Sequence, residues 1–250
     1  MNQVHDNQHK ERTEIQWSKY AEHYDQICEV NPSYSEMINL VVNNALSRDL
    51  PRQAQVLDVG AGTGNLIAEL ARQKTDWNFV HLDYDQGMNS KARAKYASLG
   101  LKNVSILERS AEDSEFRAGS FDLILTTNAI YAIPGYAALL ENIKNWLAES
   151  GTLIAVDFGR PQNTNDWIVY IAKNLLKEKG LTTAFKVLRE NWEVARQNRR
   201  TSEAQGEGNY WVHNNSEFRI ALEKAGFNVE RNSECYRGYS DLAVCSKAQK

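Results

Sequence analysis

Residues 56–64 read Val-Leu-Asp-Val-Gly-Ala-Gly-Thr-Gly, and they decide the fold. The apolar run Gln55–Val59 leads into a turn with glycine at alternate positions, and helical spacing begins at Asn65. Because glycine permits positive φ and carries no Cβ, the backbone of this turn can lie against a ligand. The helix behind the turn begins with unpaired N–H donors. The stretch therefore predicts a buried strand, a ligand-binding turn and a helix in succession.

Strand and helix patterns alternate downstream of this turn. Short apolar runs separated by segments with helical spacing are typical of βαβ units, which form a parallel sheet with helices on both faces. The predicted strands are 55–59, 78–82, 104–107, 121–126, 152–156, 227–230 and 242–245, and the predicted helices are 65–74, 87–99, 136–148 and 217–224, the last capped by Ser216.

The N-terminal part of the chain lies outside this rhythm. Aromatic residues recur at helical spacing in 17–30, and Asn31-Pro32 is typical of a helix start. We therefore expect a helical cap over 15–50, preceded by a flexible polar tail over 1–14.

A second irregular segment follows the fifth predicted strand. It is too long for an ordinary connection, so we expect a helical lid, 160–212, inserted in a domain that spans 51–250. One predicted lid helix carries Trp167 to Leu176, and the other carries Phe185 to Ala195. The aromatic residues expected to enclose a substrate chamber here are Trp167, Tyr170, Trp192, Tyr210 and Trp211.

The composition is that of an ordinary globular protein. The chain has 250 residues, 42% hydrophobic and 24% charged, with a formal net charge of −3. This balance argues against a nucleic-acid or anionic membrane partner, and no apolar run approaches the roughly 20 residues of a membrane span. Three cysteines without CxxC spacing, and no histidines at metal-ligand spacing, predict no metal site. Without a signal-peptide pattern, we expect a cytoplasmic monomer or homodimer.

Two carboxylates stand at the ends of neighbouring predicted strands. Asp58 comes two residues before the first glycine, where it would repel a phosphate but suit a cationic amine. Asp83 ends the next strand, about 20 residues after the turn, where an acid accepts hydrogen bonds from ribose hydroxyls. Either aspartate alone could be a solvated turn residue, but beside the glycines we interpret both as ligand contacts.

These stretches, with Asp83-Tyr84-Asp85-Gln86-Gly87-Met88 following the second strand, resemble class I S-adenosylmethionine-dependent methyltransferases. The branch that acts on quinones, sterols, amines and other small molecules is the most similar, and the resemblance runs from about residue 55 to 158. It implies a Rossmann-like, mostly parallel sheet of about seven strands, the last antiparallel, with S-adenosyl-L-methionine as cofactor.

The resemblance also implies roles for single residues. Asp58 would hold the methionine amino group, and Asp83 the ribose hydroxyls. The turn would pass beneath the methionine and ribose, and the residues after the second strand would flank the adenine. The implied cofactor contacts in these segments are Asp58, Gly60, Ala61, Gly62, Gly64, Asp83, Tyr84 and Met88.

Further implied contacts follow the third and fourth strands. Arg109-Ser110-Ala111-Glu112 stands where the family has a G-D-A-E-like segment, with Ser110 in place of the aspartate, so Ala111 and Glu112 are the expected adenine contacts. Thr127 and Asn128 end the fourth strand, which faces the reactive methyl in this family. Asn128 is out of register with an N-P-P-Y motif, which disfavours amine-positioning nucleobase or glutamine methyltransferases.

Three residues are candidates for catalysis. Tyr20-Ala21-Glu22-His23-Tyr24-Asp25 resembles the Y-x-x-x-Y-D stretch of many small-molecule members, in which Tyr24 would face the sulfonium. Tyr131 stands where such members often carry histidine, and His213 follows the insertion as a candidate base. Core packing remains an alternative for each of them.

The expected activity is in-line methyl transfer to an oxygen, nitrogen or carbon nucleophile of a small molecule, for which the protein supplies positioning and exclusion of water. A glycine turn indicates which cofactor binds, but it does not indicate which carbon–sulfur bond of the sulfonium is broken. Aminocarboxypropyl transfer, cyclisation or lysis on the same fold, and a non-catalytic binding subunit, therefore remain alternatives. An RNA methyltransferase is disfavoured by the acidic balance.

Overall fold

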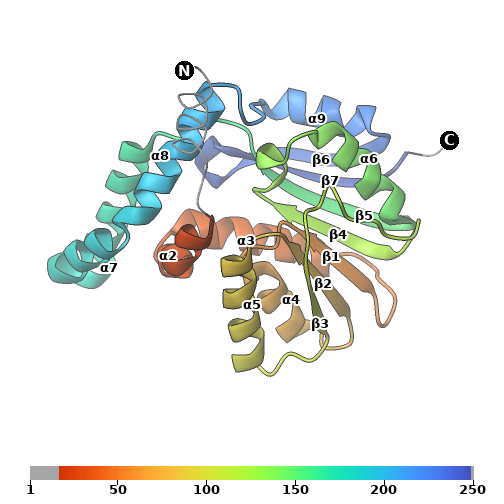
Figure 1. Cartoon of the computed structure of the whole chain (residues 1–250), viewed down its shortest axis with the longest axis horizontal. Helices are drawn as coiled ribbons and strands as arrows, with labels where there is room; N and C mark the ends of the chain where they lie inside the picture. The colour runs from red at the N-terminus through yellow and green to blue at the C-terminus, as the bar shows by residue number, and fades with distance from the viewer. Residues whose placement is uncertain (1–16, 249–250) are drawn as a thin grey trace, which may run out of the picture.

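The computed structural model describes residues 17–248. The tail predicted over 1–14 lies outside the described residues. Seven strands form one sheet in the order β3-β2-β1-β4-β5-β7-β6 (Figure 1). The strands are β1 Gln55–Val59, β2 Asn78–Asp83, β3 Val104–Glu108, β4 Phe121–Thr127, β5 Leu147–Phe158, β6 Phe227–Cys235 and β7 Ser240–Lys247.

The pairing of the strands confirms the predicted fold class. β1 pairs in parallel with β2 and β4, and β2–β3 and β4–β5 are also parallel. Only β7 runs antiparallel to both of its neighbours, β5 and β6. β6 extends beyond its predicted end at residue 230, because a register shift between Val229 and Arg231 lets pairing with β7 continue to Cys235.

Helices cover both faces of the sheet, as the alternation of patterns predicts. One apolar core lies against α3 (Pro32–Leu46), α4 (Asn65–Gln73) and α5 (Gln86–Ser98). The other lies against α6 (Tyr136–Trp146) and α9 (Asn215–Lys224). The predicted cap of α9 was wrong by two residues. Asn214, not Ser216, is the N-cap, because its side chain and that of Glu217 form a reciprocal capping box.

The N-terminal helices, α2 (Trp17–Glu29) and α3, and the lid helices, α7 (Thr164–Glu190) and α8 (Trp192–Gly206), gather at one end of the sheet (Figure 1). The second predicted lid helix was wrong, because it crosses the boundary between α7 and α8 at Asn191. The buried amide of Asn191 donates to the Val187 carbonyl and ends α7 there. Gly180, at φ 77° and ψ 172°, breaks α7 internally.

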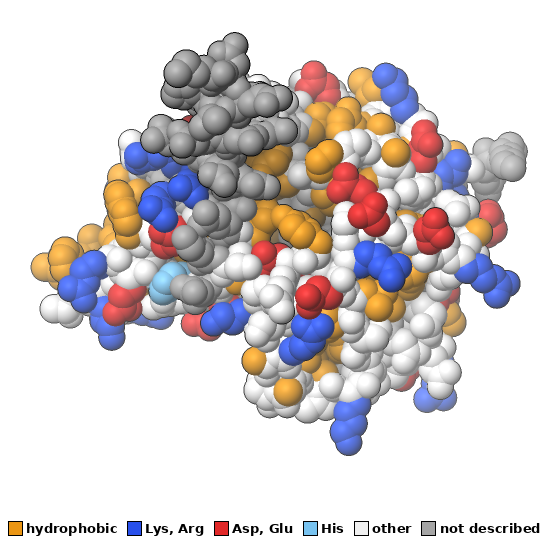
Figure 2. Space-filling view, viewed as in Figure 1, with side chains coloured by type: hydrophobic (Ala, Val, Ile, Leu, Met, Phe, Trp, Pro, Cys, Tyr) orange, Lys and Arg blue, Asp and Glu red, His pale blue; other side chains and the backbone are white. Residues whose placement is uncertain are grey.

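The outer part of the lid is apolar as well as charged. Hydrophobic side chains are visible on the outer part of the lid in Figure 2. Within α7, Leu181 and Phe185 are 73% and 69% exposed. Between residues 17 and 248, no helix is both long and apolar enough to cross a bilayer.

Candidate active site

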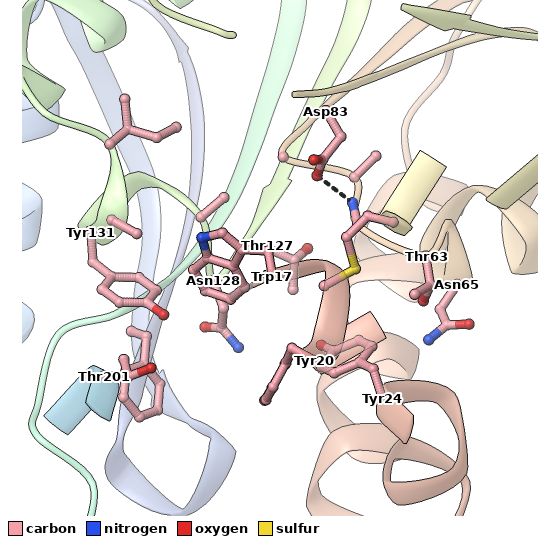
Figure 3. A pocket seen from close by; sticks show the side chains of 18 of the residues that line it. Trp17, Tyr20, Tyr24, Thr63, Asn65, Asp83, Thr127, Asn128, Tyr131 and Thr201 are labelled. Carbon is pink, nitrogen blue, oxygen red and sulfur yellow. Dashed lines mark hydrogen bonds between the residues drawn. The ribbon is translucent and has the colours of Figure 1, made fainter. Parts of the chain in front are cut away.

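A cavity of about 930 Å³ lies between the carboxyl ends of the strands and the N-terminal and lid helices. β1 and β4 are neighbours in the sheet although β2 and β3 separate them along the chain, so the sheet order reverses at this point. The carboxyl ends of strands at such a reversal are where open α/β sheets bind ligands. Figure 3 shows Asp83, Thr63 and Asn65 on one side of the cavity and Tyr131 and Thr201 on the other.

The glycine turn forms part of the cavity wall. Gly60, Gly62 and Gly64 all have positive φ, at 68°, 56° and 78°. Gly60, Ala61 and Gly62 line the cavity, whereas Gly64 is not among the residues that line it. A Cβ on Gly64 would lie 2.2 Å from the hydroxyl of Tyr96. Packing against α5 therefore requires this third glycine, so the structure does not bring Gly64 to the cavity as the resemblance implied.

Asp83 is held by the backbone at the edge of the cavity. One carboxylate oxygen accepts a hydrogen bond from the N–H of Gly62 at 2.8 Å, and the other accepts from Asp85 at 2.9 Å. Burial raises the pKa of Asp83, although these backbone donors oppose the shift. Each oxygen retains a lone pair, so the side chain is oriented to accept hydrogen bonds from a ligand in the cavity.

Asp58 is the more deeply buried acid, with 2% of its surface exposed. Burial raises its pKa well above the usual range, and the charge of Asp83 raises it further. No ion pair to Asp58 occurs within the described part of the chain. A buried carboxyl that lines a cavity and lacks a cationic partner suits a ligand that brings its own positive charge.

The carboxyl ends of β2, β3 and β4, with the segments that follow them, supply the other predicted cofactor contacts. Tyr84, Met88, Ala111, Glu112, Thr127 and Asn128 all line the cavity. Ser110 accepts a hydrogen bond from the Glu112 backbone and donates one to the Glu112 carboxylate, so its hydroxyl is bonded within the loop. Asn128 has a positive φ of 53°, and its side-chain oxygen accepts from Ser240.

The N-terminal helix α2 is tied to the glycine turn by Asp25. Its carboxylate accepts hydrogen bonds from Thr63 at 2.6 Å and Asn65 at 3.1 Å, and it pairs with Lys95 at 2.9 Å. This contact places Tyr24 in the cavity wall, as Figure 3 shows. Neither Asp25, Thr63 nor Asn65 was predicted as a site residue. The only sequence signal for Asp25 was its place directly after Tyr24 in the Tyr20–Asp25 stretch.

The lid and two 3₁₀ turns, η1 (Ile130–Ala132) and η2 (Tyr236–Gly238), complete the walls. Tyr131 is in the cavity wall as predicted, and its ring packs against Tyr210. Of the aromatic residues predicted to enclose the chamber, Trp167 and Tyr210 line it. The others do not: Trp211 stacks on Tyr136, Trp192 is 61% exposed, and Tyr170 packs under Arg237.

His213 does not reach the cavity. Its ring is fully buried between Asp157, 3.1 Å from one ring nitrogen, and Asp241, 3.5 Å from the other. Arg160 also pairs with Asp241. Burial alone would lower the pKa of His213, but the hydrogen bonds and charges of the two carboxylates raise it to about 9. Because His213 does not line the cavity, the structure does not bring the three predicted catalytic residues together: Tyr24 and Tyr131 lie in the cavity wall and His213 lies outside it.

Comparison with known proteins identifies the central part of the chain. Residues 56–151 match a family model described as "Methyltransferase domain". Over this segment the chain is similar to the methyltransferase domain family. The matched segment begins in β1 and ends in β5, and it holds the glycine turn, both aspartates and the ends of β3 and β4.

Relatives of the methyltransferase domain include an aklanonic acid methyltransferase, DauC, from Streptomyces sp. (strain C5), which is 30% identical over 40% of this chain and 46% of that protein. A highly reducing polyketide synthase from Fusarium sp is 29% identical over 44% of this chain and 5% of its own length. The chain thus spans less than half of these relatives. A crystal structure of an S-adenosylmethionine-dependent methyltransferase from Aquifex aeolicus has the same fold, with a TM-score of 0.61, 19% identity, and 93% and 98% of the two chains covered.

Several cavity residues lie outside the matched methyltransferase segment and carry no motif. They belong to the N-terminal helices, the end of β5, the lid and η2, and their positions along the chain are far apart. Those that the sequence analysis missed are Trp17, Cys28, Asn31, Tyr34, Phe158, Gln162, Ile171, Asn198, Thr201 and Tyr236.

Proposed function

We propose that the protein binds S-adenosylmethionine in this cavity and transfers its methyl group to a small organic molecule. The observation that carries the proposal is the joint position of the glycine turn, Asp58 and Asp83 on one wall of one cavity. A buried acid without a cationic partner fits the amino group of the cofactor, and an oriented carboxylate at the end of β2 fits a ribose diol.

The sulfonium of the bound cofactor supplies an electrophilic methyl carbon. The protein's contribution is to orient and to exclude water. Gly62 leaves space beside the turn, since a Cβ there would have only the Met88 sulfur within reach, at 4.0 Å. Tyr84 and Met88 flank the position proposed for the adenine, with the Ala111 backbone and Glu112 at its edge.

The N-terminal helix α2 and the lid close the side of the cavity where the acceptor would bind. Holding the acceptor in line with the transferred methyl supplies much of the rate through effective molarity. We propose that Tyr24 and Tyr131 contact the reacting groups and that His213 does not. The similarity to a protein named as an aklanonic acid methyltransferase and to polyketide synthases supports a small organic acceptor.

Calorimetric titration with S-adenosylhomocysteine tests the proposal. We expect the protein to bind this product, and Asp83→Ala to weaken binding by about tenfold or more through loss of charge-assisted hydrogen bonds. Asp76→Ala, at an exposed position outside the cavity, is the control and should bind normally. If the unmodified protein binds neither the cofactor nor its product, the proposed function is wrong.

A labelled cofactor also separates methyl transfer from the other sulfonium reactions. Methyl transfer leaves S-adenosylhomocysteine, whereas aminocarboxypropyl transfer or cyclisation leaves methylthioadenosine. We expect the first product.

A further inference from the structure

The cavity has two chemically different halves. Its charged wall residues are Asp58, Asp83, Arg109 and Glu112. Asp58 lies in β1, Asp83 ends β2, and the other two follow β3, all on the side proposed for the cofactor. The opposite half is built by α2, α3, η1, the end of β5, the lid and η2. The described side chains that line this half are uncharged, and they include Tyr24, Asn31, Tyr131, Phe158, Trp167 and Tyr236.

This uncharged half offers no general base among its described side chains. It contains no histidine. His81 of β2 is hydrogen-bonded to Tyr96 of α5, His213 lies between two buried carboxylates, and His23 of α2 is not among the residues that line the cavity. Burial raises the pKa of the Tyr24 and Tyr131 hydroxyls well above their usual range, so the phenols of this wall remain protonated near neutral pH. They act as hydrogen-bond donors and do not remove protons.

Two buried polar groups of the same half lack a partner within the described part of the chain. They are the indole N–H of Trp167 and the side-chain oxygen of Asn31, in residues that are 4% and 5% exposed. An unpaired buried polar group costs free energy. A ligand oxygen can accept from the Trp167 N–H, whereas the Asn31 oxygen is an acceptor that needs an O–H or N–H donor elsewhere on the ligand. A pure hydrocarbon would leave both groups unsatisfied.

Resting on the proposed function, we infer that the methyl acceptor is an aromatic or otherwise apolar molecule with its own acidic oxygen group, ionised before transfer. Carboxylic acids, enolised 1,3-dicarbonyl compounds and acidic phenols share this chemistry. The anion of such an acceptor would accept hydrogen bonds from the neutral donors of the uncharged half, and the positive charge of the cofactor sulfonium would attract it. An amine acceptor fits poorly, because its ammonium form would be repelled by the sulfonium and finds no carboxylate in this half.

The reaction then needs no proton transfer to the protein. The acceptor oxyanion contributes the electron pair of the new O–CH₃ bond, and the electron pair of the broken S–CH₃ bond stays on sulfur. One anion and one cation are consumed together, leaving a neutral ether or ester and a neutral thioether. Burial among apolar rings strengthens the attraction between the two charges before they meet.

Binding measurements test the inference without turnover. Sinefungin carries an amine where the cofactor has its sulfonium and transfers no methyl. In its presence, we expect 2-naphthoic acid to bind about tenfold or more tightly than 2-naphthylmethylamine, a difference typical of one charge-assisted interaction. Tighter binding of the amine, or no binding of the acid while sinefungin binds, overturns the inference and leaves the proposed function intact. No binding of sinefungin or cofactor defeats the proposed function itself.

Trp167→Phe keeps an aromatic side chain at this position, with a smaller ring, and removes the indole N–H. We expect it to weaken 2-naphthoic acid about tenfold without changing the affinity for sinefungin. Trp192→Phe is the matched control, because Trp192 is 61% exposed and outside the cavity wall. Equal affinity of both variants for the acid counts against a role of the Trp167 donor.

The dependence of kcat/KM on pH distinguishes an acceptor that ionises by itself from one that a protein base deprotonates. For substituted nitrophenols of graded acidity, the midpoint of kcat/KM against pH should move by one unit for each unit of acceptor pKa. A midpoint shared by all acceptors would reveal a protein base and overturn the inference.

Discussion

At the scale of single residues, the three glycines of the turn share a left-handed backbone but have different neighbours. A Cβ on Gly60 would collide with Ala129, 2.4 Å away, and one on Gly64 would collide with Tyr96. At Gly62 the space beyond the backbone is open cavity up to the Met88 sulfur. Fold packing requires the first and third glycines, and the middle one leaves room for a ligand.

Gly62→Ala tests this difference. Its φ of 56° is close to the 65° of Gly100, which has no atom within 4 Å of a Cβ position. Gly62→Ala and Gly100→Ala should therefore lose a similar free energy of unfolding, about 1–2 kcal/mol from the positive φ, as urea unfolding measures. Only Gly62→Ala should lose affinity for S-adenosylhomocysteine, by about tenfold or more. Equal affinity of the two variants would contradict the proposed position of the cofactor.

The buried acid Asp58 predicts a pH effect on cofactor binding. Since burial raises its pKa, the carboxyl holds its proton to a higher pH than a free aspartate, whereas a cationic ligand favours the ionised form. Affinity should therefore rise with pH through the raised pKa, and binding at lower pH should release a proton. Calorimetry in buffers of different ionisation enthalpy measures this release.

Asp58→Asn is the comparison for that measurement. The variant should bind S-adenosylhomocysteine more weakly and release fewer protons than the unmodified protein. Asp83 keeps its own contribution to the pH effect, because its pKa is also raised by burial. Identical proton release from the two proteins would show that Asp58 does not ionise on binding.

At the scale of elements, Asp25 connects α2 to the turn and to α5. Its carboxylate is the acceptor for Thr63 and Asn65 and the ion-pair partner of Lys95. Ser18 adds a second connection through its hydrogen bonds to Asp85. The position of Tyr24 in the cavity thus depends on a few polar contacts between α2 and the sheet domain.

Asp25→Ala should loosen α2 without unfolding the sheet. Amide hydrogen exchange in 17–29 should become faster, while exchange in the central strands stays unchanged. Affinity for S-adenosylhomocysteine should fall about tenfold, because the removed contacts orient the turn as well as the helix. Glu36→Gln, an exposed position on α3, provides the control. Unchanged exchange in α2 would show that apolar packing alone holds it.

At the scale of the whole molecule, His213 joins the end of the lid to β5, which precedes the lid, and to β7, which follows it. His213, Asp157 and Asp241 are buried together, and Arg160 pairs with Asp241 at 2.6 Å. Asp157 also accepts a hydrogen bond from the backbone of Tyr131, at 3.1 Å. Charge compensation in this cluster therefore stabilises β5 against β7 and fixes the turn that carries Tyr131.

The cluster predicts a loss of stability at alkaline pH. The folded pKa of His213, about 9, lies above its unfolded value, so its contribution is fully present below about pH 6.5 and is lost as pH rises through 9. The shift corresponds to about 3 kcal/mol at most. Thermal unfolding between pH 6 and 10 measures it.

His213→Gln should be destabilised by about 3 kcal/mol, since two buried carboxylates lose their cation, and the fall of Tm above pH 7 should largely disappear. Should the variant retain the same alkaline transition, another group must be responsible for it.

Much of the sheet domain was predictable because local signals determine it. Apolar runs of strand length, helical spacing and alternate glycines are properties of neighbouring residues, and they placed all seven strands and the acids at the ends of β1 and β2. Predictions that depended on distant contacts fared worse. Asn191 ends the first lid helix, Gly64 leaves room for the Tyr96 ring, and His213 forms a buried ion pair with Asp157. No local sequence pattern indicates any of these contacts.

The sequence by itself determined the cofactor half of this protein, because the turn at 60–64 and the acids at 58 and 83 depend on backbone conformation and on strand ends that short segments specify. Only the tertiary structure decided the acceptor half. Its walls come from residues as far apart as Trp17 and Tyr236, which meet because helices and turns from opposite ends of the chain bury their apolar faces together. Whether such a half contains a base or only donors depends on that long-range packing.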